Sequence, residues 1–364
     1  MTHESLAGPA SAAERAHGRS TYRRLARRRL LILLAIALLT TLCLGLDLST
    51  GQAVYPPSEV LAALWQRDAP LAVQVIFWEL RLPVALSALV VGASLAVAGV
   101  QMQTVLNNPL ASPFTLGLSA AASFGAAIGL VLGVTILPAA AVAYAIPVNA
   151  FLVSMAAALF IYRLSRKPGI TSEMIVLLGT TLVFSFTALL EALQYVAPDQ
   201  ALSAVVFWTM GSLSRANWLK LAIMSAVLLG VWLVFARQAW ALTALRLGEA
   251  RATSLGIPVA RLRLRSILLG SLLASVCVSF VGTIGFIGLV GPHIARLLVG
   301  EDQRFLLPAS ALCGALLLSA ASVLSKSLLP GQTLPIGIVT SLVGVPLFFT
   351  PVSYTHLTLP TILL

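Results

Sequence analysis

The sequence predicts an all-α, polytopic membrane protein with about ten transmembrane helices. Of its 364 residues, 59% are hydrophobic and only 10% are charged, whereas soluble domains carry about 45–50% apolar and about 25% charged residues. Mean hydropathy is +0.98. Because so few charges cannot cover so much apolar surface in water, we expect the chain to lie in a bilayer. The same composition excludes disordered, coiled-coil and collagen-like proteins.

Ten apolar segments approach or reach the roughly 17–25 residues that cross a bilayer as a helix. They are 30–48, 82–103, 115–133, 139–161, 172–195, 218–236, 266–282, 284–299, 305–325 and 335–349. The seventh and eighth nearly touch, so we expect them to form a tight hairpin. The last is the shortest.

Residues 1–29 are small, polar and rich in arginine, and we expect a disordered, basic cytoplasmic tail. No A-x-A cleavage site follows the first apolar segment, which predicts a retained helix rather than a signal peptide. Residues 49–81 are expected to form an external loop with an amphipathic piece at the interface.

The distribution of charge sets the orientation. An even number of spans places both termini on one side, and most of the 23 Lys and Arg residues then lie in loops on that same side. Cytoplasmic loops carry this excess, so both termini are predicted to be cytoplasmic. Basic residues placed in this way argue against nucleic-acid binding.

No motif for catalysis or metal binding is present. The H-E-x-x-H, G-x-S-x-G and P-loop patterns are absent, and Cys43, Cys277 and Cys313 lie apart within apolar runs. No stretch outside the spans is long enough for a soluble domain. We therefore predict no catalytic residue, no metal site and no cofactor bound by this chain.

Acidic residues inside the spans are nearly absent. Asp47 and Glu191 lie within a turn or two of the predicted external ends. An ion-coupled secondary transporter needs ionisable groups in mid-membrane, so this alternative is disfavoured, as is a membrane enzyme or assembly protein. Glu191 is either an interfacial carboxylate or part of a translocation path, on which we also place Thr171 and Ser172.

Small residues and prolines punctuate the spans. Gly92 and Gly99 share a stripe of the second span, and Gly285, Gly288 and Gly291 open the eighth. Small residues let helix backbones approach closely in a membrane. Pro292, followed by His293, predicts a bend in the eighth span, with His293 either a hydrogen-bonding residue or a ligand.

The cytoplasmic segment 247–258 has helical composition and ends at a glycine and a proline. Leu247, Ala252 and Leu255 are expected to share an apolar face, with Glu249 beside it. Such a short amphipathic helix either docks in a groove of a soluble partner or lies on the membrane surface. The sequence leaves both readings open.

Five blocks of sequence, in order, resemble the permease subunits of ABC importers for ferric siderophores, haem and vitamin B12. They are Arg81-Leu82-Pro83, Asn108-Pro109-Leu110-Ala111-Ser112-Pro113, Leu247-Gly248-Glu249 with Ala252 and Leu255-Gly256, Gly285-Phe286-Ile287-Gly288-Leu289-Val290 with Pro292-His293, and Leu334-Pro335-Ile336-Gly337. The resemblance covers about residues 30–350, the expected transmembrane permease domain. It implies the ten-helix fold of type II ABC importers.

The resemblance also implies partners and roles. It implies two ATPase subunits that use ATP and Mg²⁺, a second permease chain, an external binding protein that is periplasmic or lipid-anchored, and a location in the bacterial inner membrane. The ATPase-coupling residues would be Leu247, Gly248, Glu249, Ala252, Leu255 and Gly256. Arg81 and Lys326 would dock the binding protein, or alternatively extend to the membrane interface.

The resemblance leaves the cargo open among iron chelates, with a ferric siderophore expected first and haem or cobalamin as alternatives. The chain departs from the family pattern at Val84, where a second arginine is frequent, and at Ala121, Gln303 and Thr333. Val84 weakens any docking by a pair of arginines.

Residues 351–364 do not continue the pattern of the last span. Val352-Ser353-Tyr354-Thr355-His356-Leu357 is similar to the translation of a transposon-based sequencing adapter, and no basic residue follows it. Pro351 is expected to end the helix. We expect the native protein to differ from about Val352 onward, the alternative being a divergent tail.

Overall fold

The computed structural model describes residues 12–51, 74–137, 143–167, 169–329 and 331–357. Within these ranges the chain is helical and contains no β-strand. The helices are α1 (Ala12–Ser49), α4 (Leu82–Val105), α5 (Leu118–Leu132), α6 (Ala145–Leu164), α7 (Ser172–Val196), α8 (Asp199–Thr209), α9 (Trp218–Leu245), α10 (Glu249–Ser254), α11 (Val259–Val281), α12 (Ile287–Val299), α13 (Gln303–Ser327) and α14 (Ile336–Leu357). A π-helical turn η1 (Ile76–Arg81) precedes α4, and a 3₁₀ turn η3 (Leu213–Arg215) precedes α9.

Each of the ten predicted spans coincides with one of these helices. Among the described residues, seven helices are long and apolar enough to cross a membrane, and the other three predicted spans are the shorter apolar helices Leu118–Leu132, Ile287–Val299 and Ile336–Pro346. The all-α membrane fold is confirmed. None of the expected spans corresponds to α8, whose 11 residues are too few to cross a bilayer.

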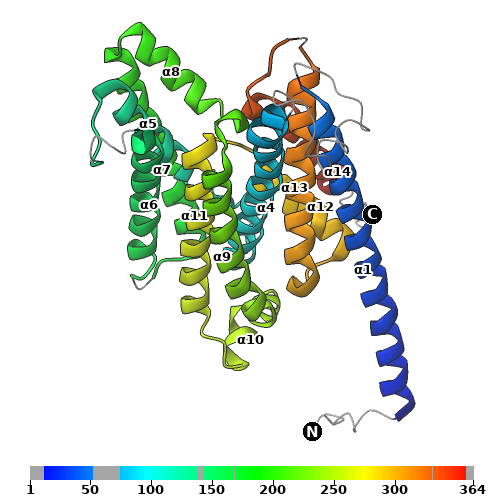
Figure 1. Ribbon diagram of the computed structural model, residues 1–364. Coiled ribbons are helices and arrows are strands. Elements are labelled where there is room, and N and C mark those ends of the chain that lie inside the picture. Colours follow the sequence, from blue (N-terminus) through cyan, green and yellow to red (C-terminus); the bar gives the residue numbers. More distant parts are fainter. Residues whose placement is uncertain (1–11, 52–73, 138–142, 168, 330, 358–364) are drawn as a thin grey trace.

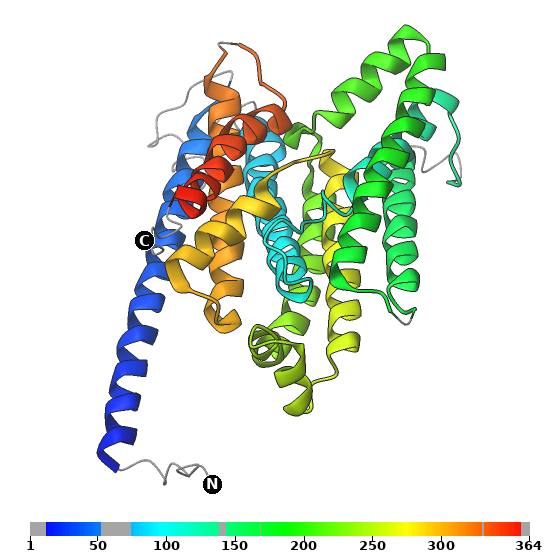
Figure 2. The ribbon, with the colours of Figure 1, turned by 180° about the vertical axis from the view of Figure 1, so that it is seen from behind.

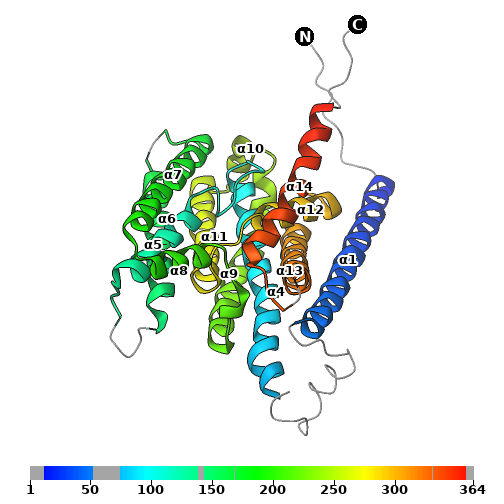
Figure 3. The same ribbon diagram turned by 90° about the horizontal axis from the view of Figure 1, so that it is seen from above.

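Helix α4 forms the centre of the bundle. It packs against α13, α11, α12 and α9, and most of its residues are buried. Seen from above, α5 to α8 lie on one side of α4, and α1, α12, α13 and α14 lie on the other (Figure 3). A helix that is apolar all round requires such a central position.

Glycines bring α4 into backbone contact with its neighbours. A Cβ added at Gly99 would overlap the carbonyl oxygen of Gly288 in α12, and one added at Gly92 would overlap that of Gly314 in α13. Pro292 has no N–H to bond the Gly288 carbonyl, the acceptor four residues earlier. The freed carbonyl is therefore the group that meets Gly99. The predicted packing role is confirmed for Gly92, Gly99 and Gly288, whereas a Cβ at Gly285 would meet nothing within 4 Å.

The expected hairpin of the seventh and eighth spans is wrong. Helix α11 packs against α4, α6 and α9, whereas α12 packs against α13 and α4. Between them Gly282 and Phe286 take positive φ values of 81° and 66°. These residues carry the chain across α4, so that α4 separates the two spans.

Both ends of the chain are more helical than expected. Helix α1 begins at Ala12, so disorder is wrong for residues 12–29; arginine is a good helix former, and Arg29 pairs with Asp302 of another element. Helix α14 continues past Pro351 to Leu357, so the expected stop at Pro351 is wrong too. Residues 1–11 and 358–364, and most of the predicted external loop, lie outside the described residues.

The two ends of the bundle differ and are named here for reference. Helix α1 begins at the end where α10 lies, the α10 end, and finishes at the end where α8 lies, the α8 end (Figures 1 and 2). Ion pairs of Arg246, Arg263, Arg296 and Arg304 gather at the α10 end. This is the end that the charge distribution predicts to be cytoplasmic.

Candidate functional site

The predicted coupling segment forms a short helix at the α10 end. Helix α10 spans six residues, Glu249–Ser254, and protrudes from the bundle between α9 and α11 (Figure 1). Gly248 precedes it with φ 102°, and Gly256 follows it with φ 79°. Both values lie in the region that glycine adopts without steric cost, which explains glycine at these two positions.

The apolar residues of this segment do not share one face, as had been expected. Ala252 is fully buried against the body, whereas Leu247 and Leu255 are 57% and 52% exposed. Leu247 precedes α10 and Leu255 follows it, and both are exposed, whereas Ala252 within α10 packs against the bundle. Exposed leucines beside charged residues at one end of a helical bundle are typical of a surface that packs against another molecule.

Charged contacts hold α10 in place. Glu249 forms an ion pair with Arg263 of α11, and Nε of Arg263 donates to the carbonyl oxygen of Val105, 3.1 Å away. Thus the first residue of α10 is connected through α11 to the end of α4. Glu249 therefore attaches α10 to α11, because its carboxylate is paired with Arg263.

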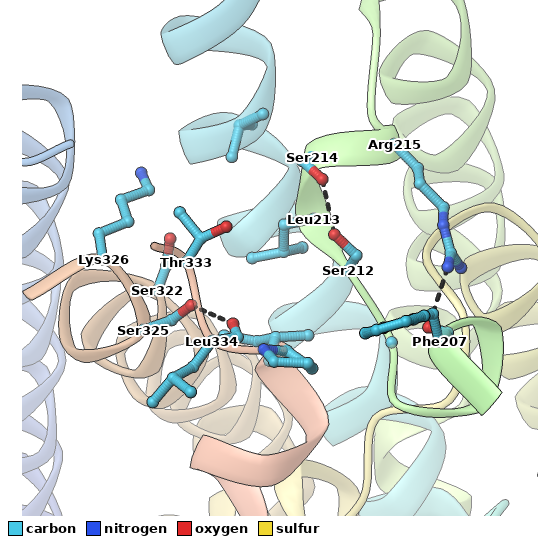
Figure 4. A pocket seen from close by; sticks show the side chains of 14 residues that line it. Phe207, Ser212, Leu213, Ser214, Arg215, Ser322, Ser325, Lys326, Thr333 and Leu334 are labelled. Atoms are coloured by element: carbon cyan, nitrogen blue, oxygen red, sulfur yellow. Dashed lines mark hydrogen bonds between the residues drawn. The ribbon is translucent and has the colours of Figure 1, made fainter. Parts of the chain in front are cut away.

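A cavity of about 330 Å³, with both polar and apolar lining residues, opens at the α8 end. Figure 4 shows Arg215 and Lys326 on opposite sides of it, with Thr333 between them. The hydroxyls of Ser212 and Ser214 lie 2.6 Å apart. The remaining lining residues include Val84, Phe207, Leu213, Ser322, Ser325, Leu334, Pro335 and Ile336. The cavity thus joins the α8–α9 connection to the α13–α14 connection.

Arg215 was not identified from the sequence, although its loop of Gly, Ser and Arg between two apolar runs could have signalled a polar site. Its Nη2 atom donates to the carbonyl oxygen of Phe207 at 3.0 Å. Burial lowers the pKa of Arg215 from its ordinary value, but an arginine keeps its charge at neutral pH.

The two residues expected to dock a binding protein are engaged inside the chain. Nζ of Lys326 lies 2.8 Å from Oδ1 of Asp47. Nη1 of Arg81 donates to the carbonyl oxygen of Leu48, also at 2.8 Å. Both cations therefore fasten the end of α1, because Asp47 and the last carbonyls of α1 attract positive charge. Lys326 also lines the cavity, whereas Arg81 lies beside α1.

The predicted path residues lie on α7 or at its N-cap, far apart from one another. Thr171 caps its first turn, where Oγ1 accepts from the backbone N–H of Met174 at 3.4 Å, and Ser172 is its first residue. Glu191 lies near the other end and is exposed. These three residues therefore do not form one site. They lie at the two ends of α7, a helix with few buried residues.

Pro292 and His293 lie inside α12, which continues as one helix through both. The predicted bend therefore does not break the helix. Nε2 of His293 is buried, and it has no hydrogen-bond partner among the described residues. Nor does that part of the chain hold any group of three His, Cys, Asp or Glu residues suited to a metal ion.

Comparison with known proteins agrees with this geometry. Residues 34–353 match the FecCD transport family. The vitamin B12 import permease BtuC of Vibrio cholerae is 36% identical over 324 residues, 89% of this chain and 93% of that protein. The hemin transport permease HmuU of Yersinia pestis is 38% identical over 285 residues, 78% of this chain and 85% of that protein.

A solved structure gives the same answer. An inward-facing conformation of a transporter described as a metal-chelate type ABC transporter superposes with a TM-score of 0.78. It is 30% identical in sequence, and the match covers 89% of this chain and 99% of that one.

Proposed function

The chain belongs to the FecCD transport family and is a multi-pass permease of an ABC importer; on this premise we propose that its cargo is an iron chelate, a ferric siderophore before haem or cobalamin. Similarity to permeases for vitamin B12 and hemin supports a large chelated cargo. Similarity to a metal-chelate type transporter supports the metal. Uptake of radiolabelled ferric siderophore, haem and cobalamin by the reconstituted importer tests this order.

We further propose that ATP is hydrolysed by two separate ATPase subunits, with Mg²⁺, and not by this chain. The exposed leucines that flank α10 carry this part of the proposal. Ala252 and Glu249 attach α10 to the bundle, while Leu247 and Leu255 are exposed beside it. An ATPase subunit that binds the two leucines would therefore move α10 and the helices attached to it. Closure of the ATPase pair would then switch the permease between its two open states.

The experiment compares two substitutions on the same short segment. Leu255→Asp places a carboxylate where a partner contact would bury it without a counter-charge, so ATP hydrolysis should continue while uptake stops. Ala252→Asp buries the charge in the permease itself and should prevent folding. Normal uptake by the Leu255→Asp importer would reject α10 as the coupling element.

A second permease chain is proposed to cover α7. Large apolar side chains, among them Leu177, Phe184 and Tyr195, are 68%, 73% and 91% exposed along this helix. Polar Thr171, Ser172 and Glu191 share it, which suits a helix that faces both a partner and an aqueous path. On this proposal the cargo passes between two chains, either identical or related.

An external binding protein is proposed to dock at the α8 end, over the cavity of Figure 4. Arg215, Lys326 and the surrounding hydroxyls place basic and polar groups in a lining that is otherwise apolar. Lys326 is already paired with Asp47. In docking, its ammonium would therefore interact with Asp47 and with the binding protein at the same time. Arg81 would act at the rim.

A further inference from the structure

A polar cluster joins four elements at the α10 end. Arg246 caps the C-terminus of α9, and Nη2 of Arg246 lies 2.8 Å from Oε1 of Glu301. The same oxygen lies 3.0 Å from Nε of Arg296, in the last turn of α12. One carboxylate in the α12–α13 turn thus pairs with two arginines, and the three side chains together keep a net positive charge. We call Arg246, Glu301 and Arg296 the clamp.

The clamp also reaches both sides of the end of α4. Nη1 of Arg246 donates to Oδ1 of Asn107 at 3.1 Å, and Nη1 of Arg296 donates to Oε1 of Gln103 at 3.1 Å. Asn107 has a φ of 47°, in the left-handed region that asparagine tolerates better than most residues. The contact with Arg246 helps to hold it there.

Gln303, two residues beyond Glu301, extends these contacts inward. Its backbone N–H donates to Oγ1 of Thr243 in α9 at 3.0 Å, and its Nε2 donates to Oγ1 of Thr104 in α4 at 2.8 Å. The start of α13 is therefore bonded to α9 and α4 both at its surface and in its interior.

The clamp lies where the coupling segment joins the body. Arg246 is followed directly by Leu247 and Gly248, and Gly248 is one of the two glycines with positive φ that bound α10. On the far side of Gly248 the chain protrudes. Besides the Glu249–Arg263 pair, Arg246 thus gives α10 a second connection to the bundle, and Glu301 extends this connection to α12 and α13.

We infer that Glu301 is a positioning residue for coupling, which transmits movement of α10 to the half of the bundle formed by α12, α13 and α14. The inference rests on the proposed function of α10. Side chains of the clamp are only partly exposed, at 28% for Arg246, 39% for Glu301 and 18% for Arg296. Water therefore screens them less than it screens surface ion pairs.

The test uses the whole importer, with its ATPase and binding protein, in vesicles. ATP hydrolysis and chelate uptake are measured separately for wild type, Glu301→Gln and Asp302→Asn. Asp302 is the matched control: it lies in the same turn but pairs with Arg29 and Arg304, outside the clamp. In Glu301→Gln, uptake per ATP should fall about tenfold, within the usual range of coupling between sites, and Asp302→Asn should keep the wild-type ratio.

Three results would overturn the inference: an unchanged ratio in Glu301→Gln, an equal fall in Asp302→Asn, or a loss of hydrolysis and uptake in proportion together with lower thermal stability. If Glu301→Gln does not fold, Glu301→Asp and Arg246→Lys keep the charges but shorten their reach, and each should lower the ratio by a smaller factor. Absence of ATP-driven uptake in the wild type would instead reject the proposed function.

Discussion

Nζ of Lys326 and Oδ1 of Asp47 lie 2.8 Å apart and join the last turn of α1 to the end of α13. Asp47 is completely buried, and its Oδ1 also accepts from the hydroxyl of Ser322 at 2.8 Å. A buried carboxylate requires such partners. Helix α1 is otherwise poorly covered, with Leu31, Leu38 and other large side chains more than half exposed, so this pair is a principal attachment at the α8 end.

Replacing Lys326 with methionine should destabilise the protein. It leaves Asp47 buried without a counter-charge, which costs about 3–5 kcal/mol. The double variant Asp47→Asn/Lys326→Met should recover most of the loss, and Lys167→Met, an exposed control, should change little. Thermal unfolding in detergent measures all three. Equal stability of Lys326→Met and wild type would show that the pair contributes nothing.

The same double variant separates attachment from docking. If Lys326 also binds the external protein, association should stay weak even though stability is restored, and most clearly at low ionic strength. Association at the wild-type rate would assign Lys326 to α1 alone.

Gly99→Ala should destabilise the bundle, whereas Gly230→Ala should not. A Cβ at Gly99 meets the backbone oxygen of Gly288, while a Cβ at Gly230 meets nothing within 4 Å. Overpacking costs about 1–3 kcal/mol, and alanine in place of an unobstructed helical glycine gains up to about 1 kcal/mol. Opposite shifts of the unfolding temperature are expected. Shifts of the same sign would contradict the close approach of α4 and α12.

Gly256→Ala should loosen α10 without unfolding the protein. The added Cβ has open space around it, so the cost is the left-handed backbone at φ 79°, about 1–2 kcal/mol. Hydrogen exchange should become faster across residues 249–257 and stay unchanged in α4. Gly45→Ala, in open helical surroundings, is the control. A slower exchange in Gly256→Ala would mean that the backbone does not hold this conformation.

Asp302 should make stability depend on pH. Burial raises the pKa of its carboxyl. The hydrogen bonds and charge of Arg304, together with the charge of Arg29, lower this pKa by more than burial raises it, so the pKa of Asp302 lies below the ordinary value. A depressed folded-state pKa stabilises the protein above the unfolded-state pKa of about 3.9, and this contribution is lost as pH falls through the folded-state value. Asp302→Asn should therefore be less stable than wild type near pH 7, and the difference should close below about pH 4. A difference that is constant with pH would contradict the pairing, and Glu191→Gln is the control.

A cysteine at position 184 should cross-link two permease chains in the assembled importer. Phe184 is 73% exposed at the centre of α7, and Leu229 of α9 is a control at 60%. Cys43 is replaced beforehand because it is partly exposed, whereas Cys277 and Cys313 are buried. Cross-linking at Leu229→Cys, and none at Phe184→Cys, would place the partner on a different face.

Hydropathy alone placed the ten spans, because a bilayer requires a long apolar run wherever a helix crosses it. The five matching blocks of sequence indicated the family, and the short helix expected within residues 247–258 is present as α10. The expected common apolar face is absent: Ala252 is buried against the bundle, whereas Leu247 and Leu255 are exposed. A six-residue helix has too few turns for periodicity to fix which side faces the body.

What the sequence by itself determined is the set of local properties: apolar length, charge placement, and the glycines and prolines that helices need at close contacts. Which helices meet was decided by the tertiary structure alone. It separated α11 from α12 by α4, turned Arg81 and Lys326 toward α1, and brought Arg246 to Glu301. These contacts join residues dozens to hundreds of positions apart, and their partners are selected by packing around α4, a quantity that no local pattern contains.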